Sequence, residues 1–141
     1  ETAEQHWLTY AVAMLLFNGL FIGAVAGYLI ARGMTDTFYP FIAGHGPFEL
    51  TGIVLAGVAG LKLGWALVAP GRLRRAEALR RAAADGVRLI LGMTALLTLA
   101  AFIEAFWSAN HAIPVAVKYT VGGIGWLLVI LYLSRAGRDA A

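Results

Sequence analysis

The stretch "PFELTGIVLAGVAGLKLGWALV", residues 47–68, is the clearest indication of the fold in this sequence. It is almost wholly apolar and contains two charged side chains, Glu49 and Lys62. An α-helix rises 1.5 Å per residue, so about 20 apolar residues cross the ~30 Å hydrocarbon core of a bilayer. Residues 47–68 are therefore predicted to form a transmembrane helix.

Further apolar runs of similar length lie on both sides of this stretch and predict spans at residues 7–30, 87–107 and 114–133. The composition agrees, because 60% of the residues are hydrophobic and 13% are charged, whereas soluble domains carry about 25% charged residues. The chain has no cysteine, which excludes disulfides and thiolate metal sites. We expect an all-α, polytopic membrane protein with four transmembrane helices, forming a single domain over residues 1–141.

Charge is distributed unevenly along the chain and predicts its orientation. The connection between the second and third spans is rich in arginine, and cytoplasmic loops retain an excess of Lys and Arg. Both termini are therefore predicted to be cytoplasmic, with a short interfacial segment before Pro47 on the outer side. Residues 71–86 predict a short amphipathic helix on the inner surface, bound to anionic lipid or to a cytoplasmic partner. Its arginines are Arg72, Arg74, Arg75, Arg80 and Arg81. Nucleic acid is not implied as a partner.

Small residues recur every fourth position in the first two spans. Such stripes allow the backbones of membrane helices to approach closely. We expect the first two spans to pack on each other, either within one chain or across a homo-oligomer. The residues are Gly19, Gly23 and Gly27 in the first span, and Gly52, Ala56, Gly60 and Gly64 in the second.

Polar side chains gather at one predicted depth, near the outer ends of the later spans. Ionisable groups inside a membrane are costly and usually face a bundle interior or a cavity. A group of five is therefore the candidate site: His45, Glu49, Glu104, His111 and Lys118. The first span holds one strongly polar side chain, Asn18.

Three interpretations of these polar groups remain open. In the structural one, Glu49 lies in the first turn of its helix and satisfies free N–H groups, while Glu104 and Lys118 form a buried ion pair. In the second, His45, Glu49 and Glu104 bind a divalent metal such as zinc and leave one position open for water. In the third, Glu49 and Glu104 act as gates for proton or ion passage. Haem is not favoured, because neither His45 nor His111 lies within a predicted span.

Motifs in a fixed order resemble those of the stage II sporulation protein M family. They are "FNGLFIGAVAG" at residues 17–27, "GHGPFELTGIVLAGVAGLKLGWALVAPG" at residues 44–71, and "AAFIEAF" at residues 100–106. The resemblance covers about residues 15–135, and it places His45 and Glu49 in an H-G-x-x-E motif and Glu104 in an I-E-A motif. Family members are typically longer at the N-terminus, so we expect this chain to be a fragment or a shortened relative.

The resemblance implies a multi-pass protein of the cytoplasmic (inner) membrane of a bacterium or archaeon, with relatives that organise complexes with peptidoglycan-degrading partners. It implies no transferable catalytic chemistry. We therefore expect a non-catalytic membrane scaffold or complex subunit in cell-envelope remodelling, which self-associates or joins other membrane subunits. The alternatives are a metal-dependent intramembrane enzyme that uses His45, Glu49 and Glu104, and a proton- or ion-coupled transporter component.

Overall fold

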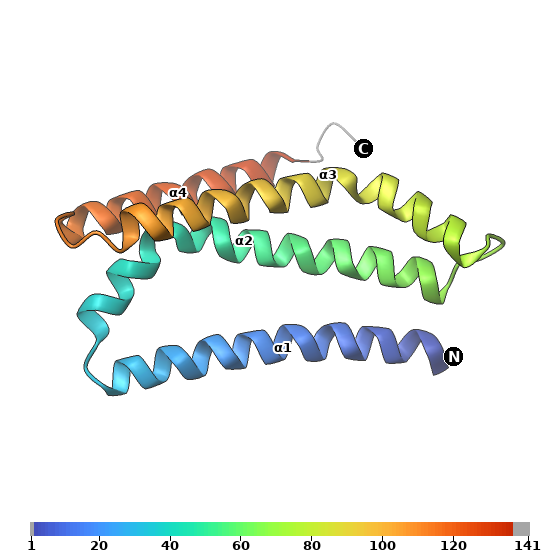
Figure 1. Ribbon diagram of the computed structural model, residues 1–141, viewed down its shortest axis with the longest axis horizontal. Helices are drawn as coiled ribbons and strands as arrows, with labels where there is room; N and C mark the ends of the chain where they lie inside the picture. The colour runs from blue at the N-terminus through green and yellow to red at the C-terminus, as the bar shows by residue number, and fades with distance from the viewer. Residues whose placement is uncertain (1, 137–141) are drawn as a thin grey trace.

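The structure is a computed structural model that describes residues 2–136, with side chains described from Val12 onward. Throughout this range the regular structure is helical. The elements are α1 (Thr2–Ala31), α2 (Thr35–Val68), α3 (Arg75–Phe102), the π-helical segment η1 (Ile103–Ser108) and α4 (Val115–Arg135). Four helical stretches, with η1 continuing α3, are long and apolar enough to span a membrane, which confirms the predicted class (Figure 1).

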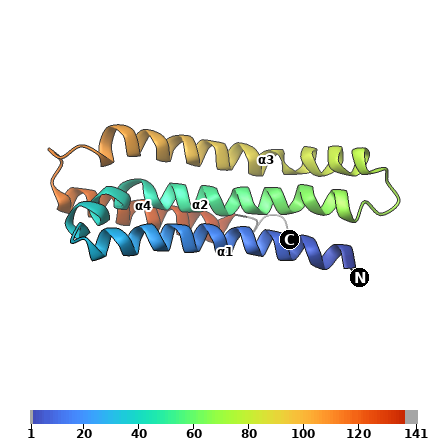
Figure 2. The ribbon, with the colours of Figure 1, turned by 60° about the horizontal axis from the view of Figure 1, so that its bottom comes forward.

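The central element is α2, on which α1, α3 and α4 each pack. It lies between α1 and α3 in both views of the ribbon (Figures 1 and 2). The chain runs up and down: α1 begins at the end of the bundle that contains the arginine-rich connection, and α4 runs toward that end but stops short of it (Figure 1). The opposite end contains the start of α2, η1 and the start of α4, and the polar residues gather there.

The start of α2 differs from the prediction. The helix begins at Thr35 instead of Pro47, and it contains Pro40 and Pro47 in its interior, so the expected interfacial segment is largely helical. A proline inside a helix lacks the N–H that would bond the carbonyl four residues earlier, and it bends the helix. Figure 1 shows the first turns of α2 inclined to the rest of the helix. Membrane helices tolerate such prolines where a neighbouring helix covers the released carbonyl.

The arginine-rich segment is also not a separate surface helix. Arg72 and Arg74 lie in the connection, and Arg75 begins α3, which continues without a break to Phe102. The stretch Arg75–Ser108 has 34 residues, or about 50 Å at 1.5 Å per residue. This exceeds the ~30 Å hydrocarbon core, so the first turns of α3 extend beyond it. Glu77 and Arg81, four residues apart on α3, form an ion pair at 2.7 Å.

Glycines on α2 and α4, not those on α1, make the closest helix contacts. A Cβ atom added at Gly19, Gly23 or Gly27 would meet no atom within 4 Å, so this stripe does not pack on α2 within the chain. In α2, Gly52 faces Leu97 of α3, and Gly60 meets nothing within 4 Å. By contrast, α4 approaches α2 so closely that a Cβ at Gly122 would collide with the carbonyl oxygen of Ala43.

Pro47 explains this contact between α2 and α4. Because Pro47 has no N–H, the carbonyl of Ala43 has no helical partner four residues ahead. That carbonyl faces Gly122, and the ring of Pro47 lies 3.2 Å from the Cβ position of Gly125. A Cα–H group against a carbonyl oxygen is a weak but recurrent helix contact. Gly122 and Gly125 therefore fit the proline bend of α2, and any side chain at Gly122 would separate the helices.

We predict that Gly122→Ala lowers the free energy of unfolding by about 1–3 kcal/mol, the usual cost of overpacking a well-packed contact. The measurement is thermal or SDS-induced unfolding of the purified protein in detergent. The matched control is Gly123→Ala, because a Cβ there meets nothing within 4 Å and alanine is the better helix former. Equal stability of the two variants would contradict the assigned contact.

Candidate functional site

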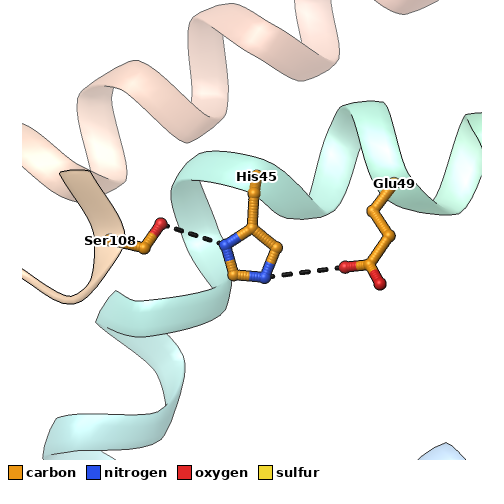
Figure 3. Close-up of polar contacts among 3 residues, drawn as sticks. All are labelled: His45, Glu49 and Ser108. Atoms are coloured by element: carbon orange, nitrogen blue, oxygen red, sulfur yellow. Dashed lines mark hydrogen bonds and ion pairs between the residues drawn. The ribbon is translucent and has the colours of Figure 1, made fainter. Parts of the chain in front are cut away.

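His45 is the centre of the polar cluster. It lies on α2 two residues before Pro47 and is 3% exposed. Its Nδ1 atom is 3.0 Å from the hydroxyl oxygen of Ser108, and its Nε2 atom is 3.6 Å from the Oε2 atom of Glu49 one turn along α2 (Figure 3). The ring edge of His45 packs against Phe41, with centroids 5.2 Å apart. The tautomer with a proton on Nε2 suits both polar contacts, since the Ser108 hydroxyl then donates to Nδ1.

Ser108 connects this histidine to α4. It is the last residue of η1 and is 2% exposed. Its backbone carbonyl accepts a 2.7 Å hydrogen bond from the Nζ atom of Lys118, in the first turn of α4. The hydroxyl of Ser108 thus contacts a side chain of α2, and its carbonyl accepts a hydrogen bond from a side chain of α4. The cluster therefore joins three separate elements, α2, η1 and α4.

The predicted site residues are only partly brought together. His45 and Lys118 contact Ser108, and Glu49 contacts the far side of the His45 ring, whereas Glu104 is exposed and lies outside the cluster. The predicted ion pair between Glu104 and Lys118 is absent from the described residues, because Lys118 instead donates to Ser108. His111 is exposed in the loop before α4. Asn18 donates to the carbonyl of Met14 within α1, away from the cluster.

The three-ligand metal site predicted from the sequence is not assembled. Among the residues whose side chains are described, no group of three His, Asp or Glu side chains is placed to hold a metal ion. By depth along its helix, Glu104 lies at the level of His45. Its position around the helix axis, however, directs its side chain outward. Of the three proposed ligands, only His45 and Glu49 are neighbours.

Ser108 is the member of the cluster that sequence reasoning missed. The predicted third span ends at residue 107 and leaves Ser108 outside it, but Ser108 still belongs to η1 and is buried. The order carboxylate, imidazole, hydroxyl is that of an acyl-transfer triad. However, the 2% exposure of Ser108 leaves its hydroxyl inaccessible to a substrate in this arrangement. The cluster is therefore suited to joining helices.

The fold and cluster define a four-span membrane protein in which buried polar contacts connect the helices. The sequence profile described as stage II sporulation protein M matches residues 7–109, so the chain belongs to the stage II sporulation protein M family. Comparison with curated proteins and with solved structures found no match. The matched range contains His45, Glu49 and Ser108, while α4 with Lys118 follows it.

We predict that Ser108→Ala lowers the free energy of unfolding by about 1 kcal/mol, since Nδ1 of buried His45 loses its interhelical partner. The backbone carbonyl that binds Lys118 is retained, so the change isolates the hydroxyl. Unfolding in detergent is again the measurement. The control is Thr120→Ala, whose exposed hydroxyl donates to Ala116 within α4. A loss no larger than in this control would show that the contact between His45 and Ser108 does not stabilise the bundle.

Proposed function

We propose that the chain is a non-catalytic scaffold or complex subunit of a prokaryotic cytoplasmic membrane, acting in cell-envelope remodelling. The observation that carries this proposal is the arrangement of the polar cluster. Ser108 of η1 contacts both His45 of α2 and Lys118 of α4, so these contacts fix the relative positions of helices. Family membership supports the same role, because the resemblance implies relatives that organise envelope complexes.

Within this proposal, α1 is the helix that contacts other membrane subunits. No residue in the apolar window of α1 is buried, and α1 packs on no described element as extensively as α3 packs on α2. The stripe formed by Gly19, Gly23 and Gly27 faces open space, and such stripes allow close approach of another helix. Candidate partners are a second copy of this chain and membrane-anchored proteins of peptidoglycan remodelling.

Cross-linking tests the role of α1 directly, because the chain has no native cysteine. We predict that a single cysteine at Gly23 forms a cross-linked dimer in native membranes, whereas one at Phe21, on the other side of α1, does not. The readout is the dimer fraction on a non-reducing gel. Gly23→Leu should also abolish complementation of the envelope defect in cells that lack the protein, because a bulky side chain blocks close approach.

Two results would contradict the proposed scaffold role. The first is complementation by Gly23→Leu at the level of the unchanged protein, together with equal dimer fractions from positions 21 and 23. The second is a stoichiometric metal in the purified protein that is lost on His45→Ala, which would favour the metal-dependent alternative. That alternative has two neighbouring ligands, His45 and Glu49, and would need further ligands from a partner.

The proposed orientation places both termini and the arginine-rich connection in the cytoplasm, following the positive-inside rule. We predict that a membrane-impermeant maleimide labels a cysteine at Asn110 in intact cells or spheroplasts, and labels one at Ala76 only after lysis. Both positions are exposed, unlike Ser108, so access depends on the side of the membrane. Labelling of position 76 from outside, or of position 110 only after lysis, would reverse the orientation.

A further inference from the structure

A pocket of about 310 Å³ lies at the end of the bundle opposite the arginine-rich connection. This end pocket is bounded by the first turns of α2, the loop after η1 and the first turn of α4. Its size is at the lower end of the range for small-molecule sites, roughly 300–1,000 Å³. The polar residues in its lining are Asp36, Thr37, Ser108, His111 and Lys118.

The deepest charged group of the end pocket is Lys118, which is 5% exposed. An ammonium group has three N–H donors, and the described residues supply one acceptor, the carbonyl of Ser108. No carboxylate among those residues lies within the 4.0 Å ion-pair distance of Lys118. Because a buried charge is costly without a counter-charge, the floor of the pocket favours an anionic group.

The start of α4 adds a second positive feature to the same wall. Val115 is the first residue of α4 and lines the end pocket, and Pro114 before it supplies no side-chain cap. The first N–H groups of a helix lack internal partners and carry part of the helix dipole, so they favour phosphate and carboxylate groups. The ammonium of Lys118 and the N-terminus of α4 therefore favour the same kind of ligand.

The rim of the end pocket has the opposite charge. The negative charge there comes from Asp36, which lies in the first turn of α2 and is exposed, and the exposed His111 also lines the pocket. A ligand with its anionic group at Lys118 can place a primary amine near Asp36. Because the pocket lies at one end of a membrane bundle, where lipid headgroups are found, we propose that it binds the phosphoethanolamine headgroup of a phospholipid. This binding does not depend on the scaffold role.

The test measures lipid binding by the full-length protein purified in detergent, using native mass spectrometry with added phosphatidylethanolamine, phosphatidylcholine or phosphatidylglycerol. We expect phosphatidylethanolamine to bind best, since phosphatidylcholine has no N–H to donate to Asp36 and phosphatidylglycerol has no amine. Lys118→Met should weaken binding about tenfold or more, the loss of one charge-assisted contact. The control Lys62→Met, an exposed lysine of α2 outside the pocket, should have no effect.

Asp36→Asn provides a second variant, because an exposed residue can be changed without disturbing the helix contacts. It should remove the preference for phosphatidylethanolamine over phosphatidylglycerol even if Lys118→Met does not fold. Soluble phosphoethanolamine and inorganic phosphate are added as competitors to distinguish a headgroup site from a general phosphate site. Displacement of bound phosphatidylethanolamine by phosphoethanolamine alone supports the proposal. Equal displacement by both competitors overturns it. Equal binding of all three lipids, or unchanged lipid preference in Asp36→Asn, would also overturn it.

Discussion

The close approach of α4 to α2 is the constraint on which the rest of the structure depends. Pro47 releases the carbonyl of Ala43, and only a residue without a side chain can lie against that oxygen, which is the place of Gly122. Lys118, Gly122, Gly125 and Val129 are the buried residues of α4, and their spacing of three or four places them on one face. The same face therefore sets the helix separation and directs Lys118 toward Ser108.

Close packing and polar contacts have different roles in this bundle. Lipid tails are as apolar as leucine side chains, so burial of apolar surface does little to drive helices together, and close packing of small residues matters more. Interhelical hydrogen bonds in membranes contribute about 0.6 kcal/mol on average. The contacts of His45 and Lys118 with Ser108 are thus too weak to hold the bundle alone, but they select one rotation and depth for each helix.

The sequence predicts the class of the fold well and the site only in part. Four apolar runs are sufficient to predict four spans, and depth along each helix predicts one level for His45 and Lys118, which both contact Ser108 in the structure. Proline favours the first turn of a helix, so the sequence predicts a helix start at Pro47, but in the structure the bundle covers the carbonyl that Pro47 releases and α2 begins at Thr35. Rotation about the helix axis is harder to predict: Glu104 shares the depth of His45 yet is exposed, and the π-helical turns of η1 alter the rotation that α-helical periodicity assumes.

The contacts of Ser108 also constrain the order of assembly during synthesis. Its hydroxyl partner lies 63 residues earlier in the chain, and the donor to its carbonyl lies 10 residues later. The first contact needs only α2 and the stretch of α3 and η1 to be in place, whereas the second also needs α4 to pack beside η1. The hydrogen bond from Lys118 is therefore the last contact of the cluster to form. Before it forms, the carbonyl of Ser108 lacks its lysine donor.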